Sequence, residues 1–322
     1  MRPTSSRQYE TARAGGFPEL EQVREELWSA ALPTGFPAPH VPYTLAHLIR
    51  DAHGDVHLID TSADTDDAWQ ALTAALAAIG SSLERVASVT ITHLHLDHLG
   101  MAQRVRAASG APVILSRADQ ESLDAAAVPA DRAEEWGVPQ HRRAELVPGP
   151  QPLAGFRADR VLDDGMLLEI PGRQVVVVHT PGHTAGHLAF SLPGEGVLLS
   201  GDHLLPDIFP GIGLDGRDDR NPIGDYLGSL DRMLEFSDCE VLPAHGYRFE
   251  GLAARVAETA AHHRRRTEEV SATLAAHPEL GVWELASRLS WTLGWEQLRG
   301  GNLHSALRQT HWHAELSRSG AG

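Results

Sequence analysis

The fold of this chain is decided largely by one stretch of sequence, Thr92-His93-Leu94-His95-Leu96-Asp97-His98-Leu99-Gly100. Three histidines and an aspartate fall here within six residues, directly after an apolar run at residues 86–92 that predicts a strand. In extended chain, residues two apart point the same way, so His93 and His95 can face one site. Imidazole nitrogen with carboxylate oxygen is the ligand mix that zinc prefers and that iron or manganese accepts. The stretch therefore predicts a metal site in a loop that leaves a strand.

Three more ligand-type residues follow predicted strands, in the kind of loop that commonly carries chemistry. They stand in Pro181-Gly182-His183-Thr184, Ser200-Gly201-Asp202-His203 and Pro243-Ala244-His245-Gly246. A glycine beside each of them lets the backbone approach a metal closely. In a chain with 19 histidines a lone histidine usually indicates packing or surface, but the four segments together favour a metal centre.

These motifs resemble, in order and context, the metal-binding motifs of the metallo-β-lactamase superfamily, over residues 36–250. The resemblance implies an α/β fold, a four-layer αββα sandwich with its metals at one edge of two packed sheets. It also implies two divalent metal ions, most readily Zn²⁺, with Fe or Mn as alternatives. The ligands that it implies are His93, His95 and His183 for the first ion, Asp97, His98 and His245 for the second, and Asp202 as the bridge.

The departures from the family pattern are informative as well. The family often has Asp-Thr-Gly after the second strand, and this chain has Asp60-Thr61-Ser62. We expect Asp60 still to hydrogen-bond a ligand histidine. True class B β-lactamases usually lack the bridging aspartate, and many place a cysteine at the second metal. This chain has Asp202, and its only cysteine, Cys239, lies outside all the motifs, so the pattern fits glyoxalase-II-like hydrolases better.

The resemblance implies a hydrolase in which two metals share one hydroxide, with Asp97 and Asp202 as the catalytic carboxylates. Two such ions bring the pKa of water down to near 7. Of the neighbouring residues, His187 is expected to make a structural hydrogen bond. His203 is a candidate substrate contact, and Tyr247 is expected to line either the pocket or the core.

The chain divides into three predicted regions. Residues 1–35 form an arm with a helix expected at 19–31, residues 36–250 form the catalytic domain, and residues 251–322 form a helical tail. Within the catalytic domain, Pro-, Arg- and Glu-rich residues 125–155 predict a surface insertion or lid. The other expected helices are 64–79, 101–108 and 225–236, and the other expected strands are 112–115, 166–170, 175–179, 188–192, 196–199 and 241–242.

The tail supports an alternative function. Its order of helices and tryptophans resembles the winged-helix-like tail of one branch of the superfamily, and it contains His262-His263-Arg264-Arg265-Arg266. A metal-dependent ribonuclease or phosphodiesterase is therefore the second hypothesis. However, eight arginines face seven acidic residues after Gly251, and a nearly neutral module attracts phosphates weakly. Packing against the catalytic domain is the favoured role of the tail.

The composition of the chain bears on its partners, its substrate and its location. A net charge of −16 repels polyanions, so nucleic acid is disfavoured as a partner. This acidic surface and the bridging Asp202 together favour a small-molecule thioester, ester or lactone as the substrate. The sequence has neither a membrane-length apolar run nor a signal-peptide pattern, so we expect no membrane partner and a cytoplasmic location. All 27 basic residues are arginine, which is typical of a GC-rich bacterial genome. The sequence does not decide whether the chain forms a homodimer. A regulator with structural metals ranks last as a function, because structural zinc sites are often rich in cysteine and this ligand set has none. A β-lactamase is disfavoured by the pattern of ligands described above.

Overall fold

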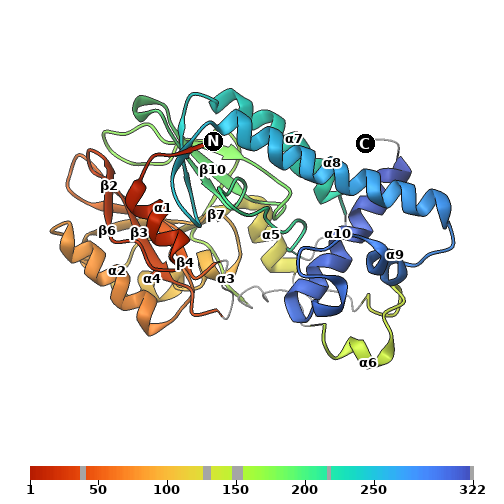
Figure 1. Ribbon diagram of the computed structural model, residues 1–322. Coiled ribbons are helices and arrows are strands. Elements are labelled where there is room, and N and C mark those ends of the chain that lie inside the picture. Colours follow the sequence, from red (N-terminus) through yellow and green to blue (C-terminus); the bar gives the residue numbers. More distant parts are fainter. Residues whose placement is uncertain (37–40, 126–131, 147–154, 216–218, 320–322) are drawn as a thin grey trace.

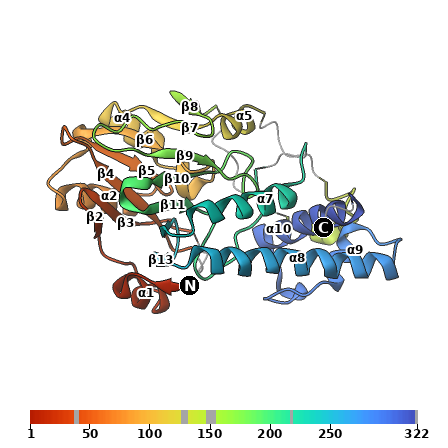
Figure 2. The ribbon, with the colours of Figure 1, turned by 90° about the horizontal axis from the view of Figure 1, so that it is seen from above.

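The computed structural model describes residues 1–36, 41–125, 132–146, 155–215 and 219–319. Two β-sheets pack face to face, and helices cover both outer faces, so the larger part of the chain is a four-layer sandwich (Figure 1). A second group of helices lies at one end of this sandwich, and a long helix joins the two parts (Figure 2). The αββα architecture and the helical tail expected from the sequence are both present.

The first sheet has seven strands. In order across the sheet they are β2 (Glu21–Arg24), β3 (Leu27–Pro33), β4 (Tyr43–Arg50), β5 (Val56–Ile59), β6 (Val86–Thr90), β7 (Val113–Ser116) and β8 (Arg160–Leu162). Strands β5 to β8 run parallel to one another, while β2 to β5 are antiparallel. Because β5 and β6 are parallel, their carboxyl ends meet at one edge of the sheet, and Asp60 comes to lie beside Thr92.

The second sheet has six strands. In order they are β1 (Arg2–Pro3), β13 (Phe249–Glu250), β12 (Glu240–Pro243), β11 (Val197–Gly201), β10 (Leu188–Leu192) and β9 (Val176–His179). Strands β11 and β12 are parallel, so the loops that carry Asp202 and His245 leave the sheet at the same edge.

Helices cover each sheet on its outer side. The first sheet packs against α2 (Asp66–Ala78) and α4 (Ala102–Ser109), and the second packs against α7 (Pro222–Met233) and α8 (Leu252–Ala276). Between the sheets lies a third apolar layer that includes Ile59, Ile114, Val177, Phe190 and Leu199. The remaining helices before the tail are α1 (Ser6–Arg13), α3 (Leu96–Leu99), α5 (Arg117–Ala125), α6 (Gln140–Arg143), η1 (Leu83–Arg85), η2 (Pro193–Glu195) and η3 (Leu234–Phe236).

Two local predictions were wrong. The helix expected at residues 19–31 is instead the hairpin of β2 and β3, because Leu27, Ala30 and Leu32 are buried in register with β4. Tertiary pairing here overrides the helical propensity of a glutamate-rich segment. The strand expected at 166–170 is reduced to one bridge between Leu167 and Val176, and no prediction anticipated β8 at the sheet edge.

The helix expected at 64–79 is confirmed by α2, and the one expected at 225–236 by α7 followed by η3. The predicted insertion at 125–155 lies partly outside the described residues. Its described part packs against the tail through Trp136 and Val138.

The tail consists of α8, α9 (Val282–Arg288), η4 (Trp295–Gln297) and α10 (Gly300–Ser319). Residues 251–319 contain no strand, so the described tail has helices without a wing. Helix α8 runs beside α7 along the second sheet and then continues into the tail, where α10 packs against it (Figures 1 and 2). Among the described helices, none is long and apolar enough to cross a membrane.

Candidate metal centre

Three imidazole nitrogens converge at the edge where β6 and β9 end. His93 Nε2 lies 2.9 Å from His95 Nδ1 and 3.2 Å from His183 Nε2. His183 Nε2 lies 3.0 Å from His95 Nδ1, which closes the triangle. Ligand nitrogens around a tetrahedral zinc, with zinc–nitrogen bonds of about 2.0–2.1 Å, stand about 3.3 Å apart. The triangle therefore has the size that one metal ion requires.

A second group adjoins this triangle and is rich in carboxylate. His245 Nε2 lies 3.5 Å from Asp97 Oδ2 and 3.3 Å from Asp202 Oδ1. His98 Nε2 lies 3.6 Å from the same Asp202 oxygen. The other oxygen of Asp202 lies 3.6 Å from His183 Nε2, in the first group. The Asp202 carboxylate thus stands between the two groups, as a bridging residue would.

The outer nitrogen of each of three histidines is held by an acceptor. The Nδ1 atoms of His98, His183 and His245 donate to Asp60 Oδ2 at 2.8 Å, the Gly211 carbonyl at 2.6 Å and the Tyr43 carbonyl at 2.7 Å. An imidazole that donates from Nδ1 and is neutral carries a lone pair on Nε2. Those lone pairs all point at the shared site, which is the orientation that metal ligands need.

His93 is oriented by a short relay through Thr92. The Thr92 hydroxyl donates its single proton to Asp60, 2.9 Å away, and so it accepts from His93 Nδ1 at 3.0 Å. One carboxylate therefore orients His98 directly and His93 through a hydroxyl. The expected hydrogen bond of Asp60 to a predicted ligand is present. Asp60 and Ser62 have φ values of 65° and 67°, a left-handed conformation that costs a non-glycine residue free energy and is found at functional sites.

The pKa values of the histidines differ between the two halves of the cluster. Burial alone would lower the pKa of His245, but the facing carboxylates of Asp202 and Asp97 outweigh burial and raise this pKa well above its usual range. The pKa of His98 is raised against burial in the same way, first by Asp60 and then by Asp202. By contrast, burial and the neighbouring His183 lower the pKa of His95 to about 3. The same facing carboxylates that raise these two pKa values would favour a bound cation at this place.

The residues present fit a metal by a second test. His98 Nε2, His245 Nε2 and Asp202 Oδ1 are buried and have no hydrogen-bond partner among the described residues. Buried polar atoms are nearly always paired, because an unpaired one costs about 1–3 kcal/mol. Here two imidazole nitrogens and one carboxylate oxygen face one another, and a bound metal cation would satisfy all three at once.

Glycines beside the ligands are required by packing. A Cβ at Gly182, whose φ is +134°, would lie 2.4 Å from Cβ of Tyr226 on α7. A Cβ at Gly201 would lie 2.6 Å from Nε2 of His187. The sequence suggested that these glycines admit a metal, but their neighbours are side chains that brace the ligand loops.

The three other predicted site residues lie around the cluster. His187 Nε2 accepts from the Asp202 amide at 3.0 Å, so its Nδ1 carries the proton and donates to Thr180 Oγ1 at 2.7 Å, which makes His187 a structural bridge. His203 is fully buried, and its ring lies 4.7 Å from that of Tyr226, which favours packing over substrate contact. The Tyr247 hydroxyl donates to Asp207 at 2.8 Å.

Sequence reasoning missed Asp119 on α5. Its carboxylate accepts from the amides of Leu94 and Gly186, both at 2.8 Å, and from the Thr184 hydroxyl at 3.1 Å. It therefore ties the His93–His95 loop to the His183 loop. Burial, followed by the charge of Asp215, raises its pKa to about 7. No motif surrounds Asp119, because all its partners are distant in the sequence.

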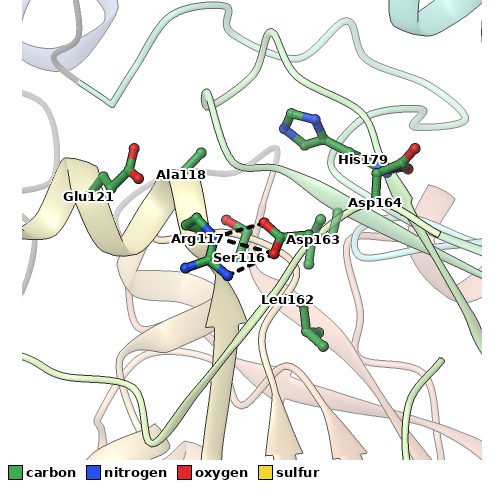
Figure 3. Close-up of a pocket in the computed structure, with 9 residues that line it drawn as sticks. Ser116, Arg117, Ala118, Glu121, Leu162, Asp163, Asp164 and His179 are labelled. Carbon is green, nitrogen blue, oxygen red and sulfur yellow. Dashed lines mark hydrogen bonds and ion pairs between the residues drawn. The ribbon is translucent and has the colours of Figure 1, made fainter. Parts of the chain in front are cut away.

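Two of the cavities near this edge differ in how they relate to the cluster. One reaches His245 and is lined also by Tyr43, Pro206, Asp207 and Ile208, so it leads to the carboxylate-rich group. The other lies where β7, β8 and β9 end and contains none of the predicted ligands (Figure 3).

In the second cavity Arg117 faces Asp163 at 2.7 Å (Figure 3). Asp164, which also lines this cavity, pairs at 2.9 Å with Arg232, which does not. The contrast with the histidine cluster, where buried imidazole nitrogens and a carboxylate oxygen have no hydrogen-bond partner among the described residues, points to the cluster as the chemical centre.

Comparisons with known proteins agree with this geometry. The family model of the metallo-beta-lactamase superfamily matches residues 41–245. A beta-lactamase-like protein 2 homolog of Caenorhabditis elegans is 25% identical over 236 residues, which cover 72% of this chain and 66% of that protein. An atrochrysone carboxyl ACP thioesterase of Aspergillus fumigatus is 28% identical over 203 residues, covering 63% of this chain and 51% of that protein. The match thus spans less than two thirds of the length of either relative.

Among solved structures, a metallo-beta-lactamase family protein from Thermus thermophilus is similar, with a TM-score of 0.76 and 27% identity. The superposition covers 93% of this chain and 96% of that chain, so the likeness extends into the helical tail.

Proposed function

Because this chain belongs to the metallo-β-lactamase superfamily, we propose that it is a dinuclear metal-dependent hydrolase that cleaves a small thioester, ester or lactone. One observation carries the proposal. Five histidines and two aspartates aim unpaired or acceptor atoms into one site, with Asp202 between its two halves. Zinc is the favoured metal, since the donors are nitrogen and oxygen only. When bound, two such ions would lower the pKa of water and polarise the carbonyl of a substrate.

The residues of the chain supply orientation and proton transfer. His93, His95 and His183 would hold one ion, and Asp97, His98 and His245 the other. The Asp97 side chain keeps 13% of its surface exposed, so it can reach both the second group and an incoming substrate. We assign Asp97 the further role of taking a proton during hydrolysis.

The substrate class rests on charge and on one relative. The cavity beside His245 is lined by Leu205, Pro206 and Ile208, with Asp207 as its only carboxylate among the described lining residues. An uncharged acyl group suits such walls better than a phosphodiester. The name of the Aspergillus fumigatus relative, a thioesterase, points to the same class of bond.

A nuclease role finds less support. Arg266 is used internally, because it pairs with Glu269 at 2.7 Å and lies over the ring of Trp291 at 4.6 Å. Of the arginine run, that leaves Arg264 and Arg265 exposed on α8. Two exposed arginines on a chain of net charge −16 make a weak phosphate-binding surface.

A hydrolysis screen of zinc-loaded protein tests the proposal. The panel holds an acyl thioester, a lactone, a cephalosporin and a phosphodiester, with Asp202→Ala as the inactive variant. Asp163→Ala is the matched control, since it removes an aspartate that is paired with Arg117 outside the cluster. We expect thioester or lactone turnover that Asp202→Ala abolishes and Asp163→Ala retains. Turnover of the phosphodiester alone, or equal turnover in Asp202→Ala, would overturn the proposal.

A further inference from the structure

The loop from Asp202 to Leu214 connects the two halves of the metal centre. It begins at the bridging carboxylate, and its Gly211 carbonyl accepts from His183 Nδ1 at 2.6 Å. Its Gly213 amide donates to the Gly182 carbonyl at 2.8 Å, and its Leu214 amide donates to the His183 carbonyl at 3.2 Å. The ring and the backbone of His183 are therefore both held by this loop.

Helix α10 of the tail is hydrogen-bonded to the same loop. Arg308 Nε donates to the Gly213 carbonyl at 2.7 Å, and only 4% of the residue's surface is exposed. The Trp312 carbonyl accepts from Asn221 Nδ2 at 3.0 Å, which fixes the start of α7 against α10. A buried guanidinium that donates to a carbonyl makes a charge-assisted hydrogen bond, stronger than a neutral one.

Helix α8 is hydrogen-bonded to the loop nearer its start, at Leu205 and Ile208. Arg255 donates to the carbonyls of Leu205 and Ile208, each at 2.7 Å, and is 3% exposed. Its guanidinium also lies over the ring of Phe209, 4.7 Å from the centroid. Two buried arginines of the tail thus bind three carbonyls of one loop in the catalytic domain.

From these contacts we infer that the C-terminal helices are a positioning element of the metal centre. Arg308 holds the loop that orients His183, and Arg255 sets the part of the loop that lines the cavity beside His245. The inference rests on the proposed metal-dependent function. Such outer partners matter because a histidine whose ring can rotate binds metal more weakly, by about 10–100-fold.

The first test measures metal affinity, by zinc titration of metal-stripped protein against a chromophoric chelator. Arg308→Met keeps the length of the side chain but removes its donors, and Arg308→Lys keeps the charge and a donor. We expect Arg308→Met to weaken one of the two ions about 10–100-fold and to leave the other within threefold. Arg308→Lys should restore a large part of the loss.

Arg318→Met is the matched control, since Arg318 lies on the same helix, is exposed and pairs with Glu315. Unchanged affinity for both ions in Arg308→Met would overturn the inference, as would the same loss in Arg318→Met. If Arg308→Met fails to fold, Arg308→Gln, which keeps a neutral donor on a shorter side chain, decides in its place. Wild-type affinity for both ions in that variant, with a native circular dichroism spectrum, would then overturn the inference. Because the readout is metal binding, a silent hydrolysis screen would remove the proposed substrate and leave this result standing.

Arg255 has a separate readout. With a substrate found in the screen, Arg255→Met should raise KM severalfold and change kcat less, because the part of the loop that it holds lines the cavity and carries no histidine ligand. A change confined to kcat would assign Arg255 to the metal-binding half instead.

Discussion

Two buried groups of histidines in this chain have opposite surroundings. At the sheet edge, His98 and His245 face Asp97 and Asp202, and these carboxylates raise the pKa values of both imidazoles against the effect of burial. In the tail, His263 packs against the rings of Tyr226 and His313, while His313 Nδ1 pairs with the Thr267 hydroxyl at 2.8 Å. Burial lowers the pKa of each of these two histidines to about 3.

The difference shows which histidines can hold a metal. Both groups exclude water, but only the first combines imidazole lone pairs with negative charge that needs compensation. A neutral imidazole packed against Tyr226, as His263 is, contributes to a core and gains nothing from a cation. Density of histidine in a sequence is thus a weaker sign of a metal site than the carboxylates that stand beside it.

The largest expected effect comes from Asp97, the partly exposed carboxylate of the metal group. Asp97→Asn removes a ligand charge and the assigned proton acceptor, so kcat/KM should fall roughly 10²–10⁴-fold. Steady-state kinetics on the substrate found in the screen measures this loss, with Asp163→Asn as the control. Activity within threefold of wild type would show that Asp97 has no such role.

A smaller effect is expected one layer outside the ligands. Asp60→Asn removes the acceptor that orients His98 and, through Thr92, His93. Zinc affinity should fall about 10–100-fold, and here both ions should be affected because one member of each group is released. Chelator competition measures it, and Asp64→Asn, at an exposed ion pair with Arg104, is the control. A loss of affinity for one ion only would show that just one of the two histidines depends on Asp60, either His98 through the direct bond or His93 through Thr92.

The tail histidines predict a pH dependence of stability. Their folded pKa values lie below the ordinary value of about 6.5, so the unfolded state binds more protons between about pH 3 and 6.5. The free energy of unfolding should therefore fall as pH drops below about 6.5, by up to about 1.4 kcal/mol per pH unit for each histidine. Urea unfolding at pH 7.5, 6.5 and 5.5 measures the slope.

His313→Gln should make this slope shallower, since it removes one titrating group, while His53→Gln, at an exposed position, serves as the control. A His313→Gln slope equal to that of the wild type would mean that the tail histidines do not govern the acid sensitivity of the fold.

The smallest effect is expected at the surface of α8. Replacing Arg264 and Arg265 together by alanine should leave kcat/KM and zinc affinity within twofold, because both side chains are exposed and lie away from the loop that Arg255 and Arg308 hold. Fluorescence anisotropy with a single-stranded RNA at low salt should show equally weak binding in both proteins. Tight binding that the double variant abolishes would restore the nuclease hypothesis.

The sequence by itself determined the superfamily, the αββα layers and the residues that form the cluster. These features depend on short-range patterns: apolar runs that end at ligand-bearing loops, and ligands spaced one or two residues apart, as in His93-Leu94-His95. Where the local pattern was ambiguous, as at residues 19–31, pairing with β4 decided the outcome, and the sequence prediction of a helix was wrong.

Only the tertiary structure decided how the cluster is braced. Asp119, the Gly211 carbonyl and the buried Arg255 and Arg308 act through hydrogen bonds to atoms far away in the chain. Backbone amides and carbonyls are the same in nearly every residue, so such contacts leave no signature in the sequence of the loop that receives them. The physical reason is that a side chain can be recognised by its type, whereas its partner carbonyl is chosen only by the packing that brings the two together.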